Sequence, residues 1–232
     1  MRTCLAEGSL NTAAVFRVKD PISALTHFIG FCGALFAMPM LLTRAAYHGA
    51  GLVAMLSYSV FMLSMVLLYG ASSAYHAFHI SEHADRVLKK IDHMMIFVLI
   101  SGSYTPVCTQ VLPQPLGGRM LLVMWGLAAA GMLFKLLWVT CPKWVSSVIY
   151  IAMGWAAIFV IRPLHLILNP AAFLWLVLGG IVYTFGGVIY ALKLPLLEER
   201  IPGFGAHELF HLFVMGGSFC HFMMNYLYIC TL

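Results

Sequence analysis

Seven apolar runs dominate the sequence, and clusters of charged residues, proline and glycine separate them. The runs cover residues 22–43, 50–78, 91–111, 117–138, 144–164, 171–192 and 207–231. Each is close to the roughly 20 residues that a helix needs to cross a bilayer, and none alternates with the period of two that marks a membrane barrel. Because lipid offers no partner to an unpaired backbone group, we predict that all seven runs are helices.

The composition supports this interpretation. Of 232 residues, 62% are hydrophobic and 9% are charged, whereas a soluble domain carries roughly 25% charged residues. Because this small number of charged residues cannot cover the surface of the protein, most of the exterior must face lipid. We therefore predict an all-α integral membrane bundle of seven transmembrane helices. Residues 22–232 would form this single domain, after a cytoplasmic tail at residues 1–21 that lacks the pattern of a signal peptide.

The distribution of basic residues predicts the orientation, because Lys and Arg favour the cytoplasmic side. The tail and the loops after the second, fourth and sixth spans share one side. With the end of span four, that side holds Arg2, Arg17, Lys19, Arg86, Lys89, Lys90, Lys135, Lys143, Lys193 and Arg200, against Arg44, Arg119 and Arg162 on the other. We expect an inner (plasma) membrane protein with its amino terminus inside and its carboxyl terminus outside. The cations are scattered and form no stripe for nucleic acid.

Few ionisable residues lie inside the predicted spans, where burial in lipid costs a few kcal/mol or more. Of the eight acidic residues, only Asp92 and Glu208 fall within a span. The remaining six lie in the tail or in the inside loops. Asp92 and Glu208 therefore need a functional or structural reason.

Histidines from three segments converge at the inner membrane surface. His207 and His211 open the last span, and residues four apart lie on one helix face, close enough to bind one metal ion. The second span ends at His76, with Ser72 one turn earlier, and the third span begins with Asp92. The predicted orientation places all of these side chains in one layer.

Three histidines beside a carboxylate are typical of an open zinc site. The imidazoles hold the ion, and the fourth position takes a water whose pKa falls toward roughly 7. Asp92 would accept a proton from that water or orient it. The alternative is a set of polar contacts between helices without a metal. The shared depth of His76, Asp92, His207 and His211 favours the metal.

The other histidines carry less weight. His221 lies ten residues beyond His211, about 15 Å along a helix, and we expect a hydrogen-bonded core residue there. His27 enters with the first span and is within reach of the histidine layer, where it would support a ligand or contact substrate. The remaining loop histidines are expected to be solvated: His48, His79, His83 and His165.

The cysteines and methionines indicate no second cofactor. The six cysteines lie mostly inside apolar runs and form no CxxC pair, which predicts free, buried thiols. The fifteen methionines and the aromatic rings are interpreted as packing and interface residues.

Several strings resemble the haemolysin III proteins of bacteria, a branch of the progestin and adipoQ receptor family. They are Ser72-Ser-Ala-Tyr-His76, Ile91-Asp-His-Met-Met-Ile-Phe, Ser101-Gly-Ser-Tyr-Thr-Pro106, His207-Glu-Leu-Phe-His211 and Phe219-Cys-His-Phe222. The resemblance covers nearly the whole chain in the expected order. It implies seven helices with a cytoplasmic amino terminus, and a zinc ion held by His76, His207 and His211, with Ser72 and Asp92 lining the site.

One position departs from the family pattern. The family often opens with an acidic residue, an asparagine and a histidine; Asp20 and His27 fit, but Ser23 occupies the asparagine place. No role is therefore carried over to Ser23. The receptor relatives resemble alkaline ceramidases in their site, which implies cleavage of lipid amide bonds, while the bacterial name records lysis of red cells.

Two functions remain open from the sequence. The first is a zinc-dependent hydrolase of a lipid amide or ester bond at the inner leaflet, with Asp92 and Ser72 as catalytic residues and a membrane lipid as substrate or ligand. The second is a non-catalytic receptor or a lytic, pore-forming protein in which zinc clamps helices together. A clamp needs a closed fourth position, whereas the neighbouring Asp92 and Ser72 suggest an open one, which favours chemistry.

A third interpretation takes His207-Glu208-x-x-His211 as the HExxH motif of a metalloprotease, with Glu208 as the base. The motif is short and matches often by chance. Receptor relatives also carry an uncharged glutamine at the place of Glu208. Exchange of Glu208 for Gln would distinguish a protease that uses Glu208 as its base from a hydrolase that uses Asp92. A glutamine cannot accept the proton, so only the protease activity would be lost.

Overall fold

The computed structural model describes residues 18–193 and 204–232. Most of the predicted tail, with Cys4 and Glu7, lies outside these residues, as do Glu198, Glu199 and Arg200. Within the described part, every regular element is helical, and seven stretches are long and apolar enough to cross a membrane. The predicted fold class is confirmed.

The seven crossing stretches are continuous helices or short series of helices. They are α1 (Pro21–Tyr47), α2 (Leu52–Ala77), α3 with η1 (Glu82–Pro106, Val107–Val111), α4 (Leu116–Leu137), α5 with η2 and α6 (Lys143–Gly154, Trp155–Val160, Ile161–Ile167), α7 (Pro170–Leu192) and α8 with η3 (Ala206–Leu227, Ile229–Thr231). The third stretch changes to a π-helical turn directly after Pro106, where proline offers no backbone donor.

The third crossing helix begins earlier than the hydropathy pattern predicts. The pattern places its start at residue 91, whereas α3 starts at Glu82. The Ser81 side chain accepts a hydrogen bond from the Ala84 backbone (3.2 Å), and Glu82 and Asp85 lie in the first turn, where acidic residues favour a helix start. Hydropathy detects only the part of a helix that crosses hydrocarbon, so the pattern predicts a loop for these polar turns.

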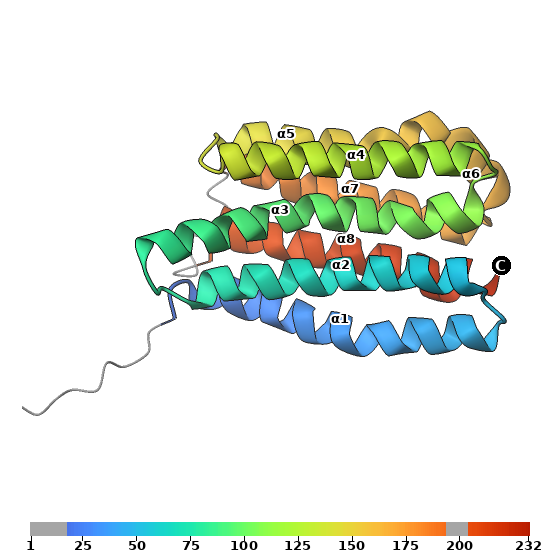
Figure 1. Cartoon of the computed structure of the whole chain (residues 1–232), viewed down its shortest axis with the longest axis horizontal. Coiled ribbons are helices and arrows are strands. Elements are labelled where there is room, and N and C mark those ends of the chain that lie inside the picture. Colours follow the sequence, from blue (N-terminus) through green and yellow to red (C-terminus); the bar gives the residue numbers. More distant parts are fainter. Residues whose placement is uncertain (1–17, 194–203) are drawn as a thin grey trace, which may run out of the picture.

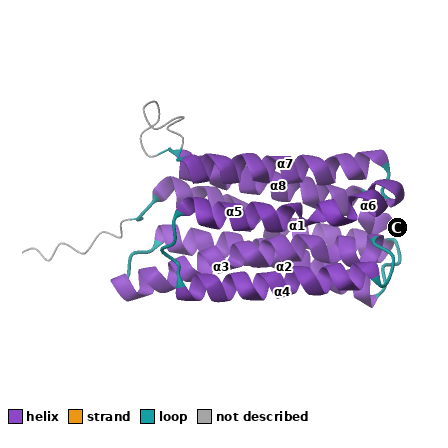
Figure 2. Cartoon of the chain, turned by 90° about the horizontal axis from the view of Figure 1, so that it is seen from above, coloured by secondary structure: helices purple, strands orange, loops and turns teal. Residues whose placement is uncertain are grey.

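The helices run side by side along the long axis of the molecule (Figures 1 and 2). α1 packs on α2, α2 on α3, α7 on α8, and α8 returns to pack on α1, while α4 covers α3 and α5 covers α7. The first and last helices are therefore neighbours. The start of α1 and the carboxyl terminus lie at opposite ends of the bundle (Figure 1), as an odd number of crossings requires.

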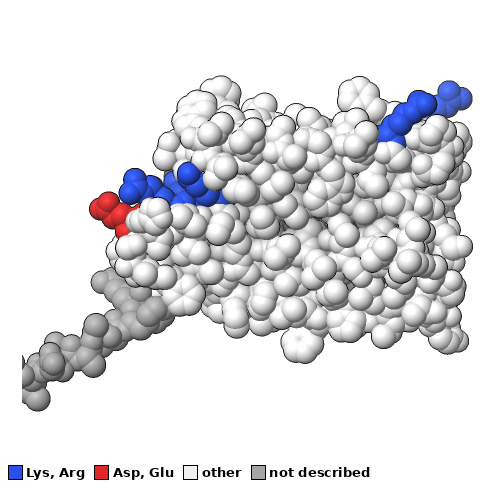
Figure 3. Space-filling view, in the orientation of Figure 1, with Lys and Arg blue, Asp and Glu red and all other residues white. Residues whose placement is uncertain are grey.

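The surface matches a lipid environment. On the face shown in Figure 3, charged side chains gather at the two ends and leave a broad uncharged belt between them. Large apolar side chains stand exposed on the helices, among them Phe36 (76%), Leu122 (77%) and Phe159 (86%). Such a surface is stable only against hydrocarbon. The chain is a multi-pass membrane protein.

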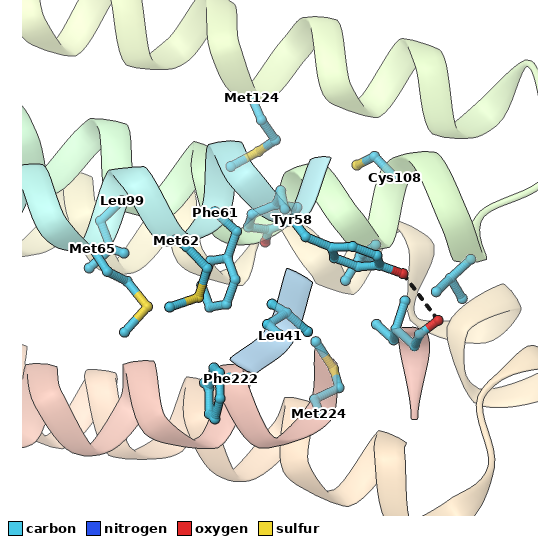
Figure 4. Packing of buried hydrophobic residues seen from close by; sticks show 14 of the residues in the cluster. Leu41, Tyr58, Phe61, Met62, Met65, Leu99, Cys108, Met124, Phe222 and Met224 are labelled. Carbon is cyan, nitrogen blue, oxygen red and sulfur yellow. Dashed lines mark hydrogen bonds between the residues drawn. The ribbon is translucent and has the colours of Figure 1, made fainter. Parts of the chain in front are cut away.

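A core of apolar side chains fixes α8 against its neighbours. Leu41, Phe61 and Met224 come from α1, α2 and α8 and pack together with no more than trace exposure (Figure 4). In the same region the Tyr58 hydroxyl donates a hydrogen bond to the Ile229 carbonyl (3.1 Å). These contacts bind α2 to the carboxyl-terminal end of the chain.

Small residues let α7 approach α8 closely, as is common between membrane helices. A Cβ added to Gly217 would lie 2.6 Å from the Tyr183 ring, and one added to Gly186 would lie 2.6 Å from Cβ of Phe213. The position of α8 is therefore set on both sides, by α7 and by α1 and α2. This determines where the histidines at its start are held.

Candidate metal centre

Three histidines meet at one end of the bundle. His76 lies in the last turn of α2, His207 in the first turn of α8, and His211 one turn further. One ligand nitrogen from each lies within 4.8 Å of the others, and the Nε2 atoms of His76 and His207 are 3.1 Å apart. Two nitrogens that bind one tetrahedral zinc ion at its usual bond lengths lie about 3.3 Å apart. The three histidines could therefore hold one metal ion.

Neighbouring side chains orient two of the imidazoles. Nδ1 of His76 lies 3.0 Å from Oδ2 of Asp20, and a carboxylate only accepts, so Nδ1 carries the proton. Thr26 donates its hydroxyl proton to the Ser23 carbonyl (2.9 Å) and lies 3.2 Å from Nδ1 of His211. Thr26 therefore accepts from His211. Both rings keep the lone pair of Nε2 free, as metal ligands require.

The contact of Asp20 with His76 was not predicted from the sequence, which places Asp20 in the tail. The backbone N–H of Asp20 also donates to the His76 carbonyl (2.9 Å), so the segment before α1 docks on the end of α2. Asp20 stands at the cap position before Pro21, yet its side chain makes no cap hydrogen bond. An acidic residue directly before a helix start is commonly a cap, so this position alone does not indicate a contact with a histidine on another helix.

Ser72 and Asp92 lie beside the histidines. Both side chains are buried, and both line a cavity of about 20 Å³ together with His207 and His211. That volume holds about one water molecule. Ser72 Oγ has no hydrogen-bond partner among the described residues, whereas Oδ2 of Asp92 lies 3.2 Å from Nδ1 of His93. The structure thus brings both predicted catalytic residues to the histidine layer.

His27 also belongs to this layer. Its ring stacks on His211 with centroids 3.7 Å apart and planes inclined by 10°, and it lines the same cavity. Both of its nitrogens are buried and lack a hydrogen-bond partner in the described part of the chain. The structure places His27 where a contact with a bound group is possible; that role stays a prediction.

Five of the remaining histidines lie apart from the layer, whereas His93 lines the same cavity. His221 is a core residue with Nε2 3.4 Å from the Leu176 carbonyl, as predicted. The four predicted to be solvated are exposed, although two of them lie in helices rather than in loops, His83 in α3 and His165 in α6.

Glu208 has a structural role in the start of α8. Its Oε1 accepts a hydrogen bond from Ser23 Oγ (2.5 Å), and its Oε2 accepts one from the Gly205 backbone (2.9 Å). These bonds join α1 to α8 and cap the helix. Because both carboxylate oxygens are engaged, the geometry does not support Glu208 as the base of a protease.

Apolar cavities continue from the histidine layer into the bundle. A cavity of about 90 Å³ shares five residues with the small one: Leu68, Ile96, Tyr150, Phe210 and Val214. A third cavity, of about 420 Å³, borders the 90 Å³ cavity. The two share Ser103, Tyr104, Gly154, Trp155, Gly180 and His221. The path runs among α3, α5, α7 and α8, past the η2 break. Its walls suit a hydrocarbon chain better than a polar ligand.

Comparisons with known proteins agree over most of the chain. A family model described as "Haemolysin-III related" matches residues 16–222. The "Hemolysin-3 homolog" of Bacillus subtilis (strain 168) is 37% identical over 205 residues, which cover 88% of this chain and 92% of the relative. "Hemolysin-3" of Bacillus cereus is 36% identical, covering 91% and 93%. "Progestin and adipoQ receptor-like protein 1" of Caenorhabditis elegans is 28% identical, covering 85% of this chain and 49% of the relative.

Proposed function

The chain belongs to the haemolysin III-related family of multi-pass membrane proteins, and from that premise we propose that it is a zinc-dependent hydrolase of an amide or ester bond in a membrane lipid. The bond would be cleaved at the inner leaflet. One observation carries the proposal: three imidazoles have ligand atoms within 4.8 Å of one another, and two of them, those of His207 and His211, line one cavity with a buried serine and a buried carboxylate.

The ligand set supports chemistry over a purely structural role. When bound, zinc supplies a Lewis acid that polarises a carbonyl and lowers the pKa of water. Structural zinc sites are closed by four protein ligands. The group in the described part of the chain offers three, His76, His207 and His211. An open fourth position would admit substrate.

Asp92 is proposed to accept the proton of the attacking water and return it to the leaving group. Its carboxylate lies in a buried position, with Oδ2 3.2 Å from Nδ1 of His93, whose hydrogen bond goes to the Lys89 carbonyl (2.9 Å). Ser72 would donate its free hydroxyl proton to the substrate carbonyl oxygen. Both groups act away from bulk water, where hydrogen bonds to developing charge are strongest.

The apolar cavities support a lipid as substrate. A lipid with its scissile carbonyl at the histidine layer could extend a hydrocarbon chain along the path toward His221, which is mostly apolar. The polar headgroup would then lie at the end of the bundle where Asp20 and Lys19 meet α2. This placement explains why a small polar site opens into larger apolar space.

The test compares purified wild-type protein with Asp92→Asn on a panel of lipid amides and esters, with zinc content measured in parallel. We expect the variant to retain zinc and to lose about 10²–10⁴-fold in hydrolysis rate. Asp85→Asn is the matched control, because Asp85 lies on the same helix but pairs with the exposed His79 (2.7 Å). A zinc-loaded wild-type protein without hydrolysis, or an Asp92→Asn variant at full rate, would contradict the proposal.

A second candidate is a non-catalytic lytic protein or receptor in which the metal clamps α2 to α8. The names of two relatives favour this candidate, because one is called a hemolysin and the other receptor-like. The same variants distinguish it. Lysis that depends on His207 and His211 but not on Asp92 would support the clamp.

A further inference from the structure

A second polar cluster lies where α4 turns into α5, and none of its members lines the cavities described above. Lys135 Nζ lies 2.5 Å from Ser146 Oγ and 3.1 Å from Cys141 Sγ. Cys141 Sγ and Ser146 Oγ are also 3.1 Å apart. All three side chains are buried, with Lys135 exposed by only 1%. The amine, the thiol and the hydroxyl therefore form a closed triangle.

Among the described residues, the amine of Lys135 has no acidic partner. Within residues 18–193 and 204–232, no carboxylate lies within ion-pair distance of its nitrogen. Burial of an ammonium group without a counter-charge is unfavourable. Of its two hydrogen-bond partners, the Cys141 sulfur is the one that more readily carries negative charge. A thiolate beside a lysine is the form of cysteine that reacts with oxidants.

We propose that Lys135 and Cys141 form a reversible sulfur–nitrogen link when the protein meets a peroxide. The Cys141 thiolate first attacks the peroxide, whose O–O bond breaks; the sulfur is oxidised to a sulfenic acid, and the released hydroxide takes a proton from the Lys135 ammonium and leaves as one water, so that the amine is neutral. The Lys135 nitrogen then attacks the sulfur, the S–O bond breaks, and the departing hydroxide takes the amine proton as a second water. The product is a sulfenamide, the same class of bond that sulfenic acids form with backbone nitrogen.

The geometry limits this reaction to one cysteine. Lys135 and Cys141 are six residues apart on either side of a turn, and the flexible lysine stem allows the nitrogen to close the remaining distance. Of the free cysteines in the described part of the chain, Cys141 is the one with a lysine amine at hydrogen-bond distance. Cys230, for comparison, donates to the Tyr226 carbonyl (3.0 Å).

The link would alter how α5 is held. A nitrogen bonded to sulfur no longer donates as an ammonium to Ser146, which is the contact that joins the end of α4 to α5. One turn further along α5, Tyr150 donates to the His93 carbonyl (3.0 Å) and lines the small cavity. Peroxide would thus act on a helix that also borders the histidine layer.

The experiment treats the full-length protein in detergent with hydrogen peroxide, blocks remaining thiols, digests with trypsin and maps the peptides by mass spectrometry. We expect a peptide that contains both residues, is two hydrogens lighter than its reduced form, and escapes cleavage after Lys135. Dithiothreitol should restore the cleavage. Cys141 found as sulfinic or sulfonic acid with normal cleavage after Lys135, or Cys141 left unreacted, would overturn the proposal.

Two variants sharpen the result. Lys135→Arg keeps the positive charge but lacks a nucleophilic amine, so Cys141 should proceed to higher acids without a link. Ser146→Ala keeps both reacting groups, so the link should still form. If Lys135→Arg does not fold, the Ser146→Ala and wild-type peptide maps decide the question alone. A link in Lys135→Arg, or its absence in a folded Ser146→Ala protein, would contradict the mechanism.

Discussion

Two polar layers follow one another along α8, and they differ in how their hydrogen bonds are satisfied. In the layer around Ser218, its hydroxyl lies 2.6 Å from the Tyr69 hydroxyl and 2.7 Å from that of Tyr183. In the layer around His207 and His211, about two turns earlier, several buried atoms lack a partner among the described residues: Ser72 Oγ, His207 Nδ1 and both nitrogens of His27. The same helices, α2 and α8, contribute to both layers.

The difference separates a packing layer from a binding layer. Buried polar groups are normally hydrogen-bonded, and helices in lipid use such bonds to hold together. The hydroxyls of Ser218, Tyr69 and Tyr183 follow this rule, although the buried Nδ1 of the neighbouring His221 has no partner among the described residues. Unpaired groups gathered beside three imidazoles are instead typical of a layer that could hold an ion or a ligand.

The largest expected effect comes from removing ligands. In His207→Ala combined with His211→Ala, a single imidazole remains, and we expect zinc content measured by mass spectrometry to fall from one ion per chain to none. Chelators should lower the melting temperature of the wild type, because a metal that binds only the folded state stabilises it, and should leave the variant unchanged. Full zinc content in the double variant would remove the distinction between the layers.

A smaller effect is expected from Asp20→Asn. Asp20 orients His76 through a 3.0 Å contact, and loss of such a carboxylate typically weakens metal binding by about 10–100-fold. Zinc affinity measured by competition with a chelator tests this in a protein that still folds. Asp85→Asn removes a carboxylate from an exposed pair at the same end and should leave the affinity unchanged. A zinc affinity equal to that of the wild type would show that the contact between Asp20 and His76 does not contribute to metal binding.

Ser218→Ala should destabilise the fold without touching the metal. Two tyrosine hydroxyls lose their common partner, and interhelical hydrogen bonds in membranes average about 0.6 kcal/mol, so we expect a loss of about 1 kcal/mol. Unfolding in mixed detergent measures it. Tyr69→Phe removes one of the two bonds and should cost less. A loss of zinc in Ser218→Ala would show that the layers are coupled.

The smallest effect on stability is expected from Ser72→Ala. Its hydroxyl makes no hydrogen bond within the described residues, so the free energy of unfolding should change by less than about 0.5 kcal/mol. Under the proposed mechanism, lipid hydrolysis should nevertheless fall. A large loss of stability with unchanged hydrolysis would show that Ser72 is a packing residue and takes no part in the reaction.

The general architecture could be predicted from the sequence because hydrocarbon imposes it. Apolar runs of spanning length predicted all seven crossings, and the positions of His76, His207 and His211 near span ends predicted that they meet, as their ligand atoms do. Depth in a membrane is one coordinate that a sequence reveals directly. Two residues at the same depth, on helices that pack against each other and on faces that point into the bundle, are brought close together.

Contacts outside the hydrocarbon could not be predicted in this way. Asp20 lies beyond the apolar run, where hydropathy carries no information about which helix end the chain touches. The early start of α3 at Glu82 escaped for the same reason, although Ser81 and the acidic first turn were available as signals. The engagement of Glu208 by Ser23 depends on the packing of α1 against α8, which no local pattern encodes.

The neighbouring positions of the first and last helices also constrain the order of biogenesis. Ser23 and Thr26 contact Glu208 and His211, partners 185 residues apart in the chain. His76 is inserted into the membrane long before the ribosome has made α8. A nascent chain that ends before residue 207 therefore contains a single one of the three imidazoles, so a metal held by all three would bind only after insertion of the final helix. A metal bound by all three histidines would in this sense report that the whole bundle has been assembled.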